Sequence, residues 1–203
     1  MNLIDRAKNM IVSPAKEWDV INGEQPDIAK IITGYVLPLA GAAAVAAFIG
    51  YGLIGVGGWG IKIKGISWGL YYALTMLLLS IALVFICAFV IDALAPSFGS
   101  EKNLGRSVQL VAYGLTPYWL GSLFAILPAI AIIGLLAGLY AFYLFYIGMP
   151  KLKKTPADKL IGYYVVSLIT VIVVYFVVGL ILNKILFSVL GLSYGFGNIK
   201  IDF

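Results

Sequence analysis

The sequence predicts an all-α membrane protein, a bundle of five transmembrane helices with short interfacial helices before the first span. The chain has 203 residues, of which 62% are hydrophobic and 11% are charged, whereas soluble proteins carry about 25% charged residues. Its mean hydropathy is +1.02, and long uncharged stretches separate its charges. This composition excludes a water-soluble enzyme, a disordered chain and a nucleic-acid-binding module, because each needs a polar surface. We predict a single membrane domain over residues 1–203.

The first 27 residues are predicted to form a cytoplasmic amphipathic segment. From residue 3 to 11, apolar side chains recur at helical spacing between charged ones, which places a helix in the headgroup plane. Ser13 and Pro14 supply an N-cap and a first-turn proline for a second short helix. That helix carries Trp18, which we expect to anchor at the membrane interface.

Four uncharged stretches follow, and each exceeds the about 20 residues that a transmembrane helix needs. They cover residues 31–61, 65–91, 107–150 and 160–183. The third is about twice as long as one crossing, and Pro128 near its middle predicts a tight turn between two spans. We therefore predict spans at about 31–52, 68–92, 107–126, 129–149 and 160–183.

The distribution of basic residues predicts the orientation of these spans. With five crossings, the N-terminus shares a side with the segments that follow the second and fourth spans. Ten of the 14 Lys and Arg residues lie on that side. The positive-inside rule therefore predicts a cytoplasmic N-terminus and an external tail over 184–203.

Two of the predicted external segments, residues 61–64 and 199–203, alternate apolar and polar side chains. A period of two residues is typical of a β-strand. We predict that the two segments pair as a small external β-element.

The sequence predicts no catalytic residue, no metal site and no cofactor. It contains no histidine, so Ser-His-Asp and Cys-His catalysis and His-ligated metals cannot be built. A G-x-S-x-G match at residues 65–69 lacks the histidine partner that a nucleophile elbow needs. Cys87, the single cysteine, lies in an apolar run and is expected to be a small buried side chain.

The third span contains a kink. Pro117 cannot donate a backbone hydrogen bond, so the carbonyl of Tyr113 loses its helical partner inside the membrane. The hydroxyl of Thr116, a tyrosine hydroxyl from a neighbouring span, or a water molecule could supply the missing donor. The kink is either structural or part of a lined cavity or gating hinge.

Two further features of the spans are candidate sites. Asp92, at the cytoplasmic end of the second span, is expected to pair with Lys102 or Arg106, although an intramembrane acid is also a functional candidate. Gly134 and Gly138 form a GxxxG spacing in the fourth span. This spacing serves either helix packing within the chain or a homo-oligomer seam.

The ordered motifs resemble the Yip-one domain family, whose eukaryotic members bind Ypt/Rab GTPases. They are the segments 13–18, 94–99, 112–117 and 148–150. The resemblance implies five spans with a cytoplasmic N-terminus, and architectural or partner-binding roles for Pro14, Trp18, Tyr113 and Pro117. The short segment before the first span is similar to that of bacterial members, which implies the bacterial inner membrane and no enzymatic activity. The resemblance does not carry Rab binding to this chain.

We therefore predict a non-enzymatic scaffold or adaptor that binds membrane lipids or other membrane proteins, and no nucleic acid. The basic loop with Lys151, Lys153 and Lys154 is expected to contact anionic lipid. The alternative is a small channel or solute transporter that uses the kinked third span as a hinge. A membrane enzyme is disfavoured, because no spacing in the sequence suggests a paired acid and base.

Overall fold

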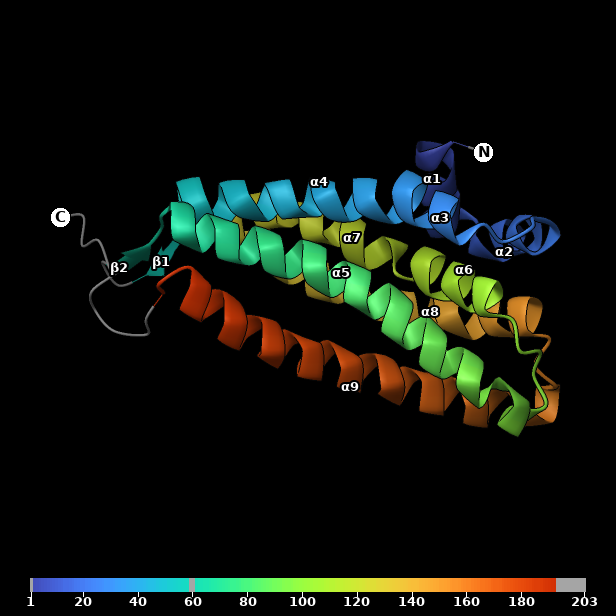
Figure 1. The fold of residues 1–203 in the computed structure, drawn as a ribbon. Coiled ribbons are helices and arrows are strands. Elements are labelled where there is room, and N and C mark those ends of the chain that lie inside the picture. Colours follow the sequence, from blue (N-terminus) through green and yellow to red (C-terminus); the bar gives the residue numbers. More distant parts are fainter. Residues whose placement is uncertain (1, 59–60, 193–203) are drawn as a thin grey trace.

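The computed structural model describes residues 2–58 and 61–192, and most of them are helical. Two short helices, α1 (Leu3–Val12) and α2 (Pro14–Gly23), lie at one end of an elongated bundle (Figure 1). Asn2 caps α1 by accepting a hydrogen bond from the Asp5 amide, and Pro14 opens α2. The two predicted N-terminal helices are therefore present.

The first long helical segment runs over residues 28–54 and contains two π-helical stretches. It consists of α3 (Ile28–Ile31), the π-helix η1 (Ile32–Val36), α4 (Leu37–Ala47) and the π-helix η2 (Phe48–Ile54). Asp27 caps its start through the Lys30 amide. π-Helical turns are rare and often occur at functional positions. The π-helix η1 carries Tyr35, whose hydroxyl contacts that of Thr116.

A short β-hairpin follows this segment, made of β1 (Val56–Gly58) and β2 (Ile61–Ile63) in antiparallel register. The predicted pairing of residues 61–64 with 199–203 is not tested, and within the described residues β2 pairs with β1. A local hairpin closes a much shorter loop than pairing with the C-terminus would, and shorter loops cost less chain entropy. Residues 199–203 lie outside the described part of the chain.

The second long helix, α5 (Ile66–Leu94), continues into the 3-10 helix η3 (Ala95–Phe98). The next segment is broken into α6 (Leu104–Gly114), α7 (Thr116–Ser122) and the 3-10 helix η4 (Leu123–Ile126). The turn at η5 (Pro128–Ile130) then leads into α8 (Ile132–Lys153), and α9 (Ala157–Val189) ends the described bundle.

Four helical segments of the described chain are long and apolar enough to cross a membrane: Ile28–Ile54, Ile66–Phe98, Pro128–Lys153 and Ala157–Val189. They correspond to the predicted spans 31–52, 68–92, 129–149 and 160–183. The predicted span 107–126 is not a continuous helix, since Leu115 separates α6 from α7. The prediction of five transmembrane helices is therefore corrected to four continuous ones in the described chain, with the predicted third span present as a broken helical segment beside them.

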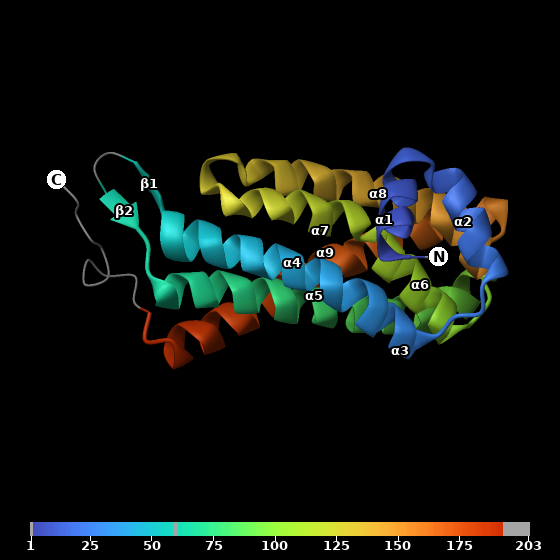
Figure 2. The ribbon, with the colours of Figure 1, turned by 90° about the horizontal axis from the view of Figure 1, so that it is seen from above.

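The bundle has two distinct ends (Figures 1 and 2). The N-terminal end contains α1, α2, residues 95–107 and residues 150–158. The hairpin end contains β1, β2, the start of α5, η4, η5 and the end of α9. Between them, α5 contacts α4, α6 and α9, while α8 packs on α6 and α7. The broken segment therefore runs along the bundle beside α8.

Glycine allows the closest helix approaches. A Cβ on Gly69 of α5 would lie 2.8 Å from the Cα of Gly52, and a Cβ on Gly121 of α7 would lie 3.0 Å from the Cα of Gly134 in α8. Both contacts are closer than a side chain would permit. The predicted GxxxG spacing therefore serves packing within the chain at Gly134, where α7 and α8 meet.

Candidate functional site

A buried polar network joins three helix ends at the N-terminal end. The Nζ atom of Lys153 lies 2.7 Å from Oδ1 of Asp92 and donates hydrogen bonds to the Ser107 hydroxyl (2.8 Å) and the Asn103 carbonyl (3.3 Å). An ammonium group has three hydrogens to donate, and here each has an acceptor. The Lys153 side chain is fully buried.

Asp92 has further partners in the same network. Its Oδ1 also accepts hydrogen bonds from the Asn103 amide (2.7 Å) and the Ser107 hydroxyl (3.1 Å). Asn103 in turn caps α6 by accepting from the Arg106 amide. A buried charge is stable only when it is paired and hydrogen-bonded, so this network is a structural joint between α5, α6 and α8.

Two predictions are corrected by this network. Asp92 pairs with Lys153 rather than with Lys102 or Arg106. The guanidinium of Arg106 instead donates to the carbonyls of Ile21 and Asn22. Lys153 was expected to contact anionic lipid, and its complete burial makes that wrong.

The other two lysines of the predicted lipid-binding loop lie at the surface. Lys151 pairs with Asp19 of α2 (2.6 Å), and the exposed Lys154 pairs with Glu101 (2.8 Å). The ammonium of Lys154 lowers the pKa of Glu101 below its usual value. Both lysines therefore already have acidic partners within the chain.

A second buried ion pair fastens α1 to α2. The guanidinium of Arg6 lies 2.6 Å from Glu17 Oε1 and also contacts Glu24, while the Asn9 amide donates to Glu17 Oε2 (3.0 Å). Arg6 and Glu17 are both buried. The same guanidinium lies 5.1 Å from the centre of the Tyr113 ring, within the range of a cation–π contact.

Trp18 is fully buried rather than placed at the membrane interface. A Cβ on Gly148 of α8 would lie 2.7 Å from the Trp18 ring, so the indole fills the space that glycine leaves. The predicted interfacial anchor is therefore a packing residue that attaches α2 to the bundle. Pro14 starts α2, as predicted, although the Ser13 side chain makes no capping hydrogen bond.

The kink in the broken segment is satisfied as expected. The Thr116 hydroxyl donates to the freed carbonyl of Tyr113 (2.6 Å), and Tyr35 Oη lies 2.7 Å from the same hydroxyl. Because the Thr116 hydrogen is already committed, Tyr35 must be the donor in that second contact. The Tyr35 ring also meets Tyr113 edge to face, with centroids 4.8 Å apart.

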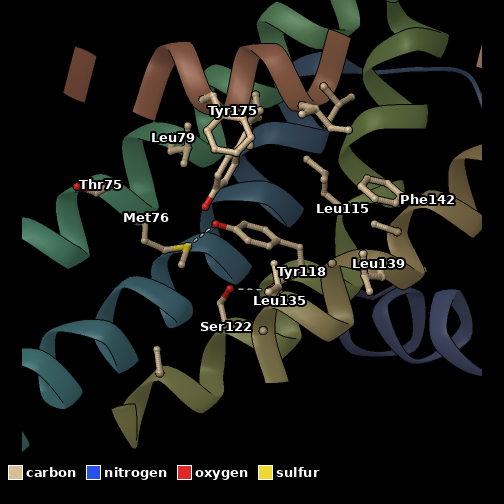
Figure 3. Close-up of a pocket in the computed structure, with 18 of the residues that line it drawn as sticks. Thr75, Met76, Leu79, Leu115, Tyr118, Ser122, Leu135, Leu139, Phe142 and Tyr175 are labelled. Carbon is tan, nitrogen blue, oxygen red and sulfur yellow. Dashed lines mark hydrogen bonds between the residues drawn. The ribbon is translucent and has the colours of Figure 1, made fainter. Parts of the chain in front are cut away.

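Beyond the kink lies an apolar cavity of about 520 Å³, bounded by α5, α7, α8 and α9 (Figure 3). This volume is within the about 300–1,000 Å³ typical of ligand sites. Leu115 and Tyr118 of the broken segment form part of its wall, together with Met76, Leu79 and Phe142. Thr116, which bonds to Tyr35, thus lies in the chain between two residues of the cavity wall, Leu115 and Tyr118.

The cavity wall combines apolar side chains with hydroxyl groups. Figure 3 shows the hydroxyls of Tyr118 and Tyr175 pointing toward one another, with Tyr118 donating to the sulfur of Met76 (3.6 Å). Gly138 lines the same space, and a Cβ added to it would lie 3.9 Å from the Tyr118 ring. Sequence reasoning placed a possible cavity at the kink but did not identify its walls, which come from helices far apart in the chain.

Cys87 is buried in the core, as expected. Within residues 2–58 and 61–192, no group of three or more His, Cys, Asp or Glu side chains is arranged to hold a metal ion.

The apolar helices and the cavity at the kink define a multi-pass integral membrane protein. The Yip1 domain profile matches residues 8–181, and the chain belongs to this family. It is 32% identical over 143 residues to the "Inner membrane protein YohC" of Escherichia coli (strain K12), covering 68% of this chain and 73% of that protein. The same identity and coverage hold for YohC of Escherichia coli O6:H1. No solved structure matches.

Proposed function

We propose that the protein is a non-enzymatic scaffold of the bacterial inner membrane that binds membrane lipid in the cavity between α5, α7, α8 and α9. The observation that carries the proposal is the cavity itself, at the level of the apolar helices and lined by apolar side chains. Its rim includes exposed residues of α8 and α9, among them Leu135, Leu139, Ile172 and Phe176. A lipid chain would therefore enter the cavity laterally from the bilayer, past the exposed rim residues of α8 and α9.

The non-enzymatic part of the proposal is supported by the partners of the buried charged side chains, which are other groups of the fold. Asp92 and Lys153 are committed to each other and to the ends of α5, α6 and α8. Arg6 and Glu17 are committed to joining α1 and α2. Reactive acids and bases need access to a substrate, whereas these groups are enclosed by their structural partners.

We also propose that the broken segment crosses the membrane, which gives five crossings with the N-terminal end in the cytoplasm. The support is the charge distribution and the name of the relatives, which places them in the inner membrane. In intact cells, a membrane-impermeant maleimide should label Lys184→Cys, but should label Lys8→Cys only after permeabilisation. Labelling of Lys8→Cys in intact cells contradicts this orientation.

Lipid binding can be tested by filling the cavity. Gly138→Leu places a side chain in the cavity, and Gly179→Leu is the matched control, because a Cβ at Gly179 meets nothing within 4 Å. Native mass spectrometry of the purified proteins should show lipid retained by wild type and Gly179→Leu, and lost from Gly138→Leu. Equal retention by Gly138→Leu contradicts the proposal.

The channel alternative predicts a different result. A conduction pathway for ions or small solutes needs polar or charged lining groups, and the apolar wall of this cavity favours a lipid chain. Solute flux into proteoliposomes above that of empty liposomes, reduced by Pro117→Ala, would favour the channel over the scaffold.

A further inference from the structure

Two hydroxyl groups in the cavity wall differ from four other helical hydroxyls of the described residues. Thr33, Ser80, Ser122 and Thr170 each donate to the carbonyl four residues earlier, which is the usual solution for Ser and Thr in a membrane helix. By contrast, the buried Oγ atoms of two cavity residues, Thr75 and Ser167, have no hydrogen-bond partner among the described residues.

These two hydroxyls come from opposite walls. Thr75 belongs to α5 and Ser167 to α9, and the Ser167 side chain is 1% exposed. A buried polar group without a partner is costly, and it is rare enough to require an explanation such as a bound molecule. Both residues line the cavity, so an occupant of the cavity is the partner that the geometry offers.

The register between α5 and α9 sets the spacing of the two groups. Asn183 donates to Tyr71 near the hairpin end, and Tyr163 donates to the Ile91 carbonyl near the N-terminal end. Ser167, four residues after Tyr163, is therefore level with Cys87 on the antiparallel α5. Cys87 is twelve residues from Thr75, which corresponds to about 18 Å along a helix axis at 1.5 Å per residue. The cavity is thus an elongated slot with a hydroxyl near each end.

The lining of the slot defines the charge of its occupant. Among the described residues, the wall contains no Asp, Glu, Lys or Arg side chain. A phosphate or ammonium head would be buried there without a counter-charge, which is strongly unfavourable inside a membrane. A hydroxyl or carbonyl oxygen, in contrast, needs only the hydrogen bonds that Thr75 and Ser167 can make.

We propose that the slot binds an uncharged long-chain lipid whose oxygen-bearing head takes either of two alternative seats, one at Thr75 and one at Ser167. The chain then extends along the slot toward the other seat. This inference rests on the proposed lipid-binding function and specifies its ligand class. A slot with a seat near each end accepts the same lipid in two opposite orientations.

The test compares two probes with the same chain in nanodiscs that contain the full-length protein. Monopalmitoylglycerol is uncharged, and palmitoyl lysophosphatidylglycerol carries an anionic phosphate. Binding is measured as the probe-dependent rise in the thermal midpoint, with native mass spectrometry for stoichiometry. The uncharged probe should raise the midpoint of wild type, and the anionic probe should not.

Substitutions then test the seats. If the two orientations are equally populated, Thr75→Val or Ser167→Ala alone should weaken binding about twofold, and the double variant should weaken it about tenfold, since one hydrogen bond is worth up to about that factor. Thr170→Val is the matched control, because Thr170 lies on α9 outside the cavity lining and donates to the Val166 carbonyl. It should bind like wild type.

A separate measurement distinguishes binding from a structural role. Replacing an unpartnered buried hydroxyl by an apolar group of similar shape should leave the probe-free midpoint unchanged or raise it. A lowered probe-free midpoint in the double variant would show that the hydroxyls have partners within the fold and would overturn the proposal.

Other outcomes are equally decisive. Unchanged binding by the double variant, or equal binding of the two probes, overturns the uncharged-lipid site. Complete loss of binding in one single variant overturns the two alternative seats. If Gly138→Leu loses its lipid while the hydroxyl variants bind normally, only this inference fails. If Gly138→Leu retains its lipid, the proposed function fails as well.

Discussion

At the N-terminal end, Lys153 Nζ contacts three oxygen atoms, whereas in the cavity Ser167 Oγ contacts no hydrogen-bond partner among the described residues. Both side chains are almost completely buried. A satisfied buried network fixes the helices that contribute to it, while an unsatisfied group is a cost that a ligand can remove. The comparison indicates that the Asp92–Lys153 network fixes the helix ends it joins, whereas the cavity hydroxyls are left for an occupant. The indole nitrogens of Trp18 and Trp68 also lack a partner among the described residues, but neither residue lines this cavity.

The kink segment connects these two regions. Arg6 of α1 contacts the Tyr113 ring, Thr116 bonds to the Tyr113 carbonyl, and Tyr118 forms part of the cavity wall. Within the broken segment, Tyr113 therefore contacts the N-terminal helix α1, Thr116 contacts Tyr35, and Tyr118 lines the cavity. Substitutions in each region should reveal how differently the two ends depend on their polar groups.

The largest effect should come from breaking the buried ion pair. Asp92→Ala leaves the Lys153 ammonium buried without a counter-charge, which should reduce the free energy of unfolding by about 3–5 kcal/mol. Unfolding in detergent micelles, followed by circular dichroism, would measure the loss. The double variant Asp92→Leu/Lys153→Met should recover part of it, and a double variant no more stable than Asp92→Ala would show that the pair is not the joint inferred here.

A somewhat smaller effect is expected where α2 meets α8. Gly148→Ala places a Cβ 2.7 Å from the Trp18 ring, and such overpacking should cost about 1–3 kcal/mol. Gly41→Ala in α4 is the matched control, because a Cβ there meets nothing within 4 Å, and it should stabilise the helix by up to about 1 kcal/mol. Equal thermal midpoints for the two variants would contradict tight packing of Trp18.

A matched pair of threonine substitutions compares the kink with the cavity. Thr116→Val removes the donor to the Tyr113 carbonyl and should cost about 1–2 kcal/mol, because a buried acceptor is left unpaired. Thr75→Val removes a hydroxyl that has no partner among the described residues, so the ligand-free protein should lose no stability. If chemical unfolding shows the same loss for both variants, the distinction between the two regions is wrong.

The smallest effect should come from the exposed pair of Lys154 and Glu101. Lys154 lowers the pKa of Glu101, so its contribution to stability is present above the unfolded-state pKa and is lost as the pH falls through the folded-state value. Lys154→Gln should move the Glu101 pKa upward in a carboxylate NMR titration while leaving the thermal midpoint nearly unchanged. An unchanged Glu101 pKa would contradict the pairing.

Several local features were predictable because neighbouring residues determine them. The α1 and α2 helices follow from apolar spacing and from Pro14, and the break in the third predicted span follows from Pro117. Thr116 was a named candidate for the freed carbonyl because it lies only three residues after Tyr113. The kink predicted at Pro117 is in the structure a full break at Leu115, so the predicted span 107–126 is divided into α6, α7 and η4.

Long-range partners were not predictable in the same way. The sequence offered nearby Lys102 and Arg106 to Asp92, yet the fold brings it Lys153, which is 61 residues away. The preference of tryptophan for membrane interfaces predicted an interfacial Trp18, whereas its ring is buried in the space that Gly148 leaves. Thr75 and Ser167 carried no signal of their own, because a helical hydroxyl normally bonds to its own helix.

By itself, the sequence determined the class of protein, the positions of four of its five predicted spans, the kink at Pro117 and the chemistry that a chain without histidine cannot perform. These depend on composition and on contacts within a few residues. The tertiary structure decided which charges are buried together, that the hairpin closes locally, and that α5, α7, α8 and α9 enclose a slot with unpartnered hydroxyls. The physical reason is that a lone side chain has many possible partners, and only the packing of distant helices selects one of them or leaves none.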